Sequence, residues 1–65
     1  MKNNEYVLWY NDSIINCDSN LSNFISYLED NFIDYRIIYG KDGRKQLIFA
    51  NPRFWVEYNG KRGKI

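Results

Sequence analysis

The chain has 65 residues, of which 18% are aromatic and 26% are charged, and its formal net charge at pH 7 is +1. A chain of this length predicts one small domain, residues 1–65, that buries only about 60% of the surface its unfolded form exposes. One cysteine and no histidine exclude an intrachain disulfide and a tetrahedral zinc site. Stability must therefore come from an aromatic-rich core, a partner chain, or both.

The sequence contains no segment typical of membrane insertion or secretion. It has no run of about eighteen apolar residues, and no apolar stretch follows a basic segment at its start. We therefore expect a cytoplasmic protein that does not bind membranes, and the lone Cys17 agrees with a reducing compartment. Nine Asn and eight Ile are typical of AT-rich coding sequences, which small phage and mobile-element genes often have.

The charges are segregated along the chain. Residues 1–34 hold one lysine against six acidic residues, a net charge of −5, whereas residues 35–65 hold eight basic residues against two acidic ones, a net charge of +6. Such a division indicates either two halves that neutralise each other, within one chain or across a homodimer, or a basic half that contacts nucleic acid.

The first predicted element is a strand over Tyr6–Tyr10. It is apolar at every position, which is typical of a central strand covered on both faces. Asn11-Asp12-Ser13 predicts a turn, after which Ile14-Ile15 forms either a short returning strand or the tail of the first strand beyond a bulge. Of these two alternatives we favour the hairpin.

An amphipathic helix is predicted next. The run Asp18-Ser19-Asn20 offers three side chains that can cap the first turn of a helix. Helical spacing then draws one apolar stripe, and the helix is predicted to end near Phe32 or Ile33. The stripe consists of Leu21, Phe24, Ile25, Leu28 and Phe32.

Two further strands, Tyr35–Tyr39 and Gln46–Ala50, are predicted to form a hairpin. Asp42-Gly43 between them is typical of a type I′ turn. A two-residue turn of this kind places Lys41 opposite Arg44 and thereby sets the register of the hairpin.

This register has a consequence for the faces of the sheet. It places Ile37 opposite Ile48 and Ile38 opposite Leu47, so both faces of the hairpin are predicted to be largely apolar. One helix covers only one of them. The second face is then expected to be covered by a partner, either a second copy of the chain or a target.

The C-terminal part begins with Asn51-Pro52, which ends the preceding strand because proline cannot donate to a ladder. A strand over Phe54–Tyr58 follows, and Asn59-Gly60 predicts a two-residue turn. Lys61–Ile65 either forms a short returning strand or frays. Alternation along Phe54–Tyr58 predicts a core face and an opposite face. The core face carries Phe54, Val56 and Tyr58, and the opposite face carries Trp55 and Glu57.

Together these elements predict a small α+β domain. The expected architecture is one antiparallel sheet of three to five strands with one amphipathic helix packed on one face, in the order β(β)αββ(β).

The residue types argue against catalysis. Without histidine the commonest general base is missing, and Cys17 has no imidazole to activate it. The four glycines have hairpin spacing and form no phosphate-binding loop. Glu29, Asp30 and Asp34 cluster near the predicted helix end, but further oxygen ligands for a metal ion are not evident. We expect no enzymatic activity, no cofactor, no metal and no small-molecule substrate.

The leading hypothesis is a non-enzymatic binding protein that occludes a macromolecular partner, most simply another protein, and that acts as a homodimer. The AT-rich composition suggests an inhibitor of a host defence protein encoded by a phage or mobile element. Aromatic and arginine side chains are the types that anchor protein interfaces. The anchors predicted on this ground are Trp55, Phe54, Tyr58, Arg53, Tyr39 and Arg44.

The alternative is a small nucleic-acid-binding module. Two groups of basic residues are predicted at hairpin ends, and on one edge they would form a patch of six positive charges for phosphate contacts. Trp55, Phe54 and Tyr58 could add base stacking. The first group is Lys41, Arg44 and Lys45, and the second is Lys61, Arg62 and Lys64.

Overall fold

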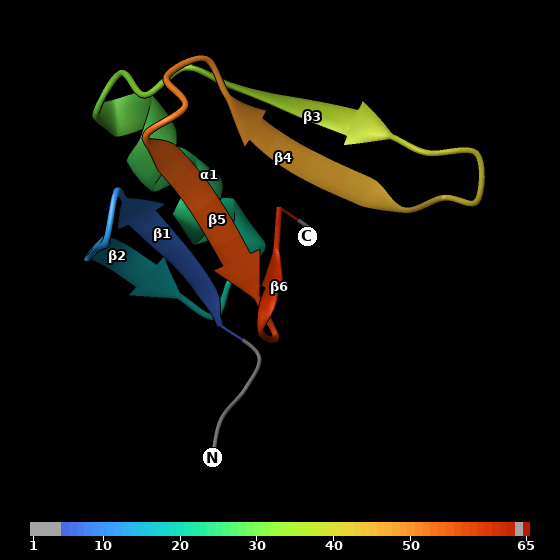
Figure 1. Ribbon diagram of the computed structural model, residues 1–65, viewed down its shortest axis with the longest axis horizontal. Helices are drawn as coiled ribbons and strands as arrows, with labels where there is room; N and C mark the ends of the chain where they lie inside the picture. The colour runs from blue at the N-terminus through green and yellow to red at the C-terminus, as the bar shows by residue number, and fades with distance from the viewer. Residues whose placement is uncertain (1–4, 64) are drawn as a thin grey trace.

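The structure is a computed structural model that describes residues 5–63 and 65 (Figure 1). These residues form six strands and one helix. In chain order the elements are β1 (Tyr6–Tyr10), β2 (Ser13–Asp18), α1 (Leu21–Asp30), β3 (Tyr35–Tyr39), β4 (Lys45–Phe49), β5 (Phe54–Tyr58) and β6 (Lys61–Arg62).

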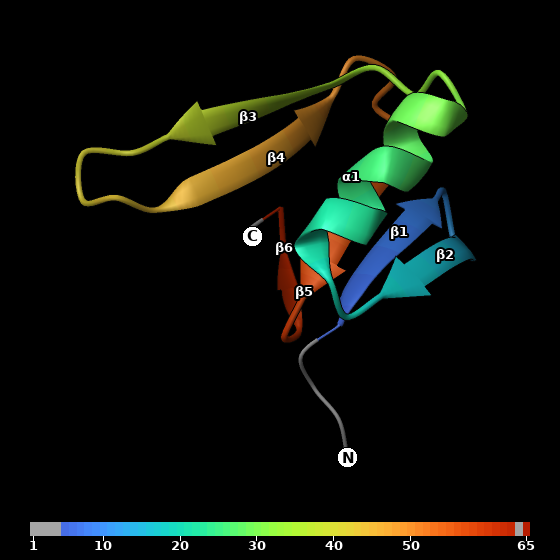
Figure 2. The same cartoon turned by 180° about the vertical axis from the view of Figure 1, so that it is seen from behind.

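The strands form two antiparallel sheets. One has four strands in the order β2-β1-β5-β6, and the other is the β3-β4 hairpin. The helix α1 lies against one face of the four-stranded sheet, while the hairpin projects to the side (Figures 1 and 2). The predicted α+β class, with one helix on one sheet face, is confirmed. The strands divide between two sheets where one had been predicted.

The end of the chain joins the two sheets. The Gly63 N–H donates to the Val56 carbonyl of β5 (2.7 Å), and the Gly63 carbonyl accepts from the Leu47 N–H of β4 (2.9 Å). The Ile65 N–H donates to the Lys45 carbonyl (3.3 Å). Gly63 has a φ of 83°, which glycine adopts without the steric cost that a Cβ brings. This residue is therefore the hydrogen-bonded junction between the sheets.

The core lies between α1 and the sheets. Its buried side chains come from four elements, β1, α1, β4 and β5, and each fully buried one stabilises the fold by roughly 1.5–3 kcal/mol. Tyr6, at the edge of the core, stacks on Tyr58 with ring centroids 4.2 Å apart. Burial, together with the neighbouring Tyr58, raises the pKa of Tyr6 above its ordinary value. The buried residues are Tyr6, Leu8, Phe24, Leu28, Leu47 and Val56.

The strand β1 is central, as predicted, because it pairs with both β2 and β5. The prediction that both its faces are covered is wrong. Leu8 is fully buried, whereas Trp9 on the other face is only half-buried, since the β3-β4 hairpin packs beside the sheet and leaves that face open (Figures 1 and 2). The predicted β1-β2 hairpin is confirmed, and its register shifts between Leu8 and Trp9.

The helix begins where the capping residues predict. The Asn20 side-chain oxygen accepts from the Asn23 N–H (3.1 Å), which satisfies one of the free donors of the first turn. The helix α1 has ten residues. Across residues 5–63 and 65 no helix combines the length and apolar character needed to cross a lipid bilayer.

The predicted end of the helix is wrong by two or three residues. The helix ends at Asp30, the Phe32 N–H donates to the Glu29 carbonyl (3.1 Å), and the Ile33 N–H donates to the Leu28 carbonyl (2.9 Å). These bonds form a Schellman motif. Its left-handed position is held by Phe32, with a φ of 55°. Phe32, which was predicted to belong to the apolar stripe, is 92% exposed. Ile33 packs against the core instead.

The β3-β4 turn differs from the predicted type I′. The Gly40 N–H donates to the Arg44 carbonyl (2.8 Å), and the Gly43 N–H donates to the Gly40 carbonyl (3.2 Å). Of the loop residues 41–43, only Gly43 has a positive φ, of 84°. This combination is the three-residue loop that ends in a glycine bulge, and it shifts the register by one residue.

The shift exchanges the faces of β4. Ile37 lies opposite Leu47, and Ile38 lies opposite Gln46, whereas the prediction paired them with Ile48 and Leu47. Leu47 is thereby directed into the core, where it is 2% exposed. The outer face is also less apolar than predicted. It carries Arg36, Ile38, Gln46 and Ile48.

The left-handed conformation of Phe32 predicts the effect of replacing it. Phe32→Gly is expected to raise the free energy of unfolding by about 1 kcal/mol, because glycine removes the steric cost of a positive φ. Urea denaturation measures this. Phe32→Ala is the matched control, since it removes the same exposed ring but keeps a Cβ. Equal stabilities of the two variants would contradict the prediction.

Candidate functional site

No element of residues 5–63 and 65 covers the face of the four-stranded sheet opposite α1. In a strand alternate side chains point to opposite faces, so the residues next to the buried Leu8 and Val56 gather on this open side. In Figure 1, β1 and β5 lie in front of α1, with the open side towards the viewer. We call this surface the tryptophan face. It is defined by Ile14 of β2, Trp9 of β1, Trp55 and Glu57 of β5, and Arg62 of β6.

Two stacked indoles form its centre. Trp9 and Trp55 are opposite each other in the β1-β5 register, with ring centroids 4.9 Å apart and an angle of 5° between the rings. The Trp9 Nε1–H donates to Glu57 Oε1 (3.0 Å), and the Trp55 Nε1–H donates to the Asn11 carbonyl (3.0 Å). Because both indole donors are satisfied, the two rings are held in one orientation.

Arg62 completes the stack. Its guanidinium carbon lies over the Trp55 ring, 4.3 Å from the centroid, which is the geometry of a cation–π interaction. The strands β1 and β6 flank β5 on opposite sides. Trp9 and Arg62 therefore cover the two faces of the Trp55 indole, and neither face is free for a nucleic-acid base.

The margin of the tryptophan face is apolar on one side and polar on the other. Ile14, opposite Trp9 in the β1-β2 register, is 58% exposed, and the adjacent Ile15 is 43% exposed. Beyond Trp55 lies an open hollow of about 520 Å³. The surface thus has an aromatic and aliphatic centre with charged groups at one border. The hollow is lined by Asn11, Asp12, Pro52, Arg53, Trp55 and Arg62.

The predicted anchors Phe54 and Tyr58 lie on the other face of β5. Phe54 packs against Tyr10 and Phe49, with ring centroids 4.8 Å and 5.8 Å apart, and Tyr58 stacks on Tyr6. The predicted alternation along β5 is therefore confirmed. It also means that these two rings stabilise the core and contribute nothing to the tryptophan face. Of the six predicted anchors, only Trp55 belongs to that face, and Arg53 lines the hollow at its border.

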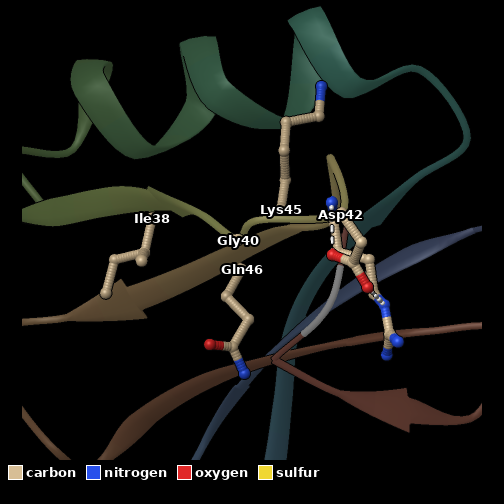
Figure 3. Close-up of a pocket in the computed structure, with 6 residues that line it drawn as sticks. Ile38, Gly40, Asp42, Lys45 and Gln46 are labelled. Carbon is tan, nitrogen blue, oxygen red and sulfur yellow. Dashed lines mark hydrogen bonds and ion pairs between the residues drawn. The ribbon is translucent and has the colours of Figure 1, made fainter.

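The other two predicted anchors lie at the far end of the hairpin. Tyr39 is 70% exposed. Arg44 lies in the turn, where its Nε donates to Asp42 Oδ2 (2.6 Å), as the dashed lines in Figure 3 show. The projecting hairpin (Figures 1 and 2) separates both residues from the tryptophan face.

The described residues of the two basic groups do not all lie together. The hairpin turn that carries Lys41 and Arg44 projects away from the β5-β6 turn and from β6 in both views (Figures 1 and 2), whereas Lys45 is the first residue of β4 and its carbonyl accepts from the Ile65 N–H (3.3 Å). Of the second group, Lys61 and Arg62 form β6, and Lys64 lies outside the described residues. The structure therefore does not place the six positive charges on one edge.

Glu29, near the end of α1, is engaged in a local hydrogen bond. The Tyr35 hydroxyl donates to Glu29 Oε2 (2.7 Å), and this hydrogen bond raises the pKa of Tyr35 above its ordinary value. Within the described part of the chain, no group of three or more cysteine or carboxylate side chains is placed to hold a metal ion.

Sequence reasoning missed the roles of Trp9, Ile14 and Arg62. Each depends on the pairing of strands that are distant in the chain, since the Trp9–Glu57 hydrogen bond spans 48 residues. The available signal was the presence of one tryptophan in each of two strands. It identifies a stack only when the β1-β5 register is known.

The Glu57 contact predicts a measurable cost. Glu57→Leu is expected to lower the free energy of unfolding by about 1 kcal/mol, because the half-buried Trp9 N–H loses its acceptor. Glu57→Gln keeps an oxygen acceptor at the same position and is expected to lose less. Urea denaturation followed by tryptophan emission measures both variants, and an equal loss in the two would contradict the assigned contact.

Comparisons with known proteins return no relative. No protein-family model, no curated protein and no solved structure matches the chain. The proposal for its function therefore rests on its own side chains.

Proposed function

We propose that the chain is a non-enzymatic binding protein that occludes a surface of another protein with its tryptophan face. The observation that carries the proposal is the Trp9–Trp55 stack on a sheet face that no element of the described chain covers. The aromatic pair lies beside Ile14, which is 58% exposed, and exposed apolar side chains gathered on one face mark an interaction site.

The residue types and their rigidity support this function. Tryptophan and arginine are the side chains most enriched among interface hot spots. Here Trp55 is held by Trp9 on one side and Arg62 on the other. Binding then orders few additional side chains, so less of the interaction energy is lost to immobilising them.

The same geometry favours a protein partner over nucleic acid. Base stacking on an aromatic residue needs a free ring face, and both faces of Trp55 are covered. The Trp55 ring, covered on both faces, presents its edge, which suits an apolar patch on a protein surface. The hairpin turn with Lys41 and Arg44 lies away from Lys61 and Arg62 of β6 (Figure 1), so phosphate contacts along one continuous track are also disfavoured.

Two matched variants test the surface. Ile14→Glu places a charge on the tryptophan face, while Ile48→Glu places the same charge at an isoleucine of similar setting, 44% exposed on the hairpin. Immobilised chains would be incubated with nuclease-treated extract of the native host, and the bound proteins quantified by mass spectrometry. We expect a protein that the unaltered chain and Ile48→Glu retain and that Ile14→Glu loses at least tenfold. Retention by all three would contradict the proposed surface.

Nucleic-acid binding is tested separately. Gel shifts with single-stranded DNA, single-stranded RNA and duplex DNA at about 50 mM salt are expected to show no complex at micromolar protein, because phosphate contacts are strongest at low salt. Lys61→Glu combined with Lys41→Glu reduces both basic groups and serves as a control. A complex that this double variant loses would replace the proposed function with the nucleic-acid alternative.

A further inference from the structure

The outer edge of β3 is the least protected strand edge in the described chain. The outer edge of β4 is bonded to Gly63 and Ile65, β6 has two residues, and the β1-β2 pair carries a register irregularity. In β3, Tyr35–Tyr39, there is no proline, no lysine and no register irregularity in its pairing with β4. These are the devices that normally prevent a strand edge from pairing with another chain.

The hydrogen-bond pattern of the hairpin shows which groups this edge presents. Gly40 bonds to Arg44, and Ala50 bonds to Asp34, so the even-numbered residues of β3 exchange their bonds with β4. In an antiparallel pair the alternate residues direct their N–H and C=O groups the other way. Those of Tyr35, Ile37 and Tyr39 therefore point outward along the open edge.

We infer that β3 pairs antiparallel with β3 of a second copy, about a two-fold axis through Ile37. This register opposes outward-directed residues to outward-directed residues, with Ile37 facing Ile37 and Tyr35 facing Tyr39. A two-fold contact must be self-complementary. This contact is self-complementary, because Tyr35 of each copy faces Tyr39 of the other. The pairing joins the two hairpins into one four-stranded sheet.

The charges of β3 agree with this register. Its one charged side chain, Arg36, lies opposite Ile38 of the second copy, so no like charges face each other directly. Arg36 and Ile38 form a pair without mutual backbone bonds, in which opposed side chains approach most closely. Ile38 is 43% exposed and points to the same side of the hairpin as Gln46, with Lys45 on the other side (Figure 3). It therefore carries no contact that the core depends on.

The dimer is independent of the proposed function, since the tryptophan face lies on the other sheet and stays open. If both hold, each dimer presents two tryptophan faces. Two linked sites raise the apparent affinity for a partner that is itself repeated or oligomeric.

Opposite charges at position 38 test the register. Ile38→Lys and Ile38→Glu remove the same side chain. Across the proposed contact, Ile38→Lys forms two like-charge pairs with Arg36 of the opposite copy, whereas Ile38→Glu forms two opposite-charge pairs. Light scattering coupled to size exclusion, from about 10 μM to 1 mM, gives the dissociation constant of the dimer. We expect a dimer for the unaltered chain and a dissociation constant at least tenfold weaker for Ile38→Lys than for Ile38→Glu. Circular dichroism confirms that both variants are folded.

A cysteine cross-link fixes the partner strand. In a Cys17→Ser background, a mixture of Arg36→Cys chains and Ile38→Cys chains is expected to form a disulfide-linked dimer on mild oxidation, because the opposed positions satisfy disulfide geometry. Each chain alone is expected not to cross-link. The inference is overturned by a monomeric mass at 1 mM, by equal dissociation constants for the two charge variants, or by cross-linking of either single chain as efficient as that of the mixture.

Discussion

One short helix serves both sheets, and the rest of the structure follows from that constraint. Phe24 and Leu28 of α1 are fully buried, and they are the side chains around which Leu8 and Val56 from one sheet and Leu47 from the other can close a core. A helix of ten residues presents a single apolar stripe. It can cover one face of the four-stranded sheet and the inner side of the hairpin, but it leaves the opposite face of the larger sheet open.

The hydrogen bonds of Gly63 make this arrangement possible. The residue bonds to β5 through its N–H and to β4 through its carbonyl, so the hairpin is held beside the helix without lying over the sheet. A hairpin folded across the other face would have buried Trp9 and Trp55. Because the junction directs it sideways, those two rings must stabilise each other, and their N–H groups find partners in Glu57 and Asn11.

Phe32 shows that local stability alone does not explain the sequence. A bulky residue in the left-handed position of a helix end is costly, and glycine is the usual occupant. The ring has no compensating burial, since it is 92% exposed. Residues held in such conformations often lie at functional sites.

Sequence patterns confined to one element correctly predicted several features of the secondary structure. Alternation placed Val56 inside and Trp55 outside, three capping residues marked the start of α1, and the apolar run Tyr6–Tyr10 marked a central strand, because each depends on neighbours a few residues away. The end of the helix was misplaced because Phe32 and Ile33 are both apolar, and only packing decides which is buried. The hairpin register was misplaced because Asp-Gly suits two loop lengths, and a one-residue difference exchanges the faces of β4.

The sequence by itself determined the α+β class, the approximate element order and the alternation of inner and outer residues along β5, since these follow from local spacing and from the size of the core. The tertiary structure alone decided that the strands form two sheets, that Trp9 meets Trp55 and Glu57, and that the hairpin turn projects away from β6. Those features join residues up to 48 positions apart in the chain. Their free energy comes from contacts between elements, and no local pattern records which elements will meet.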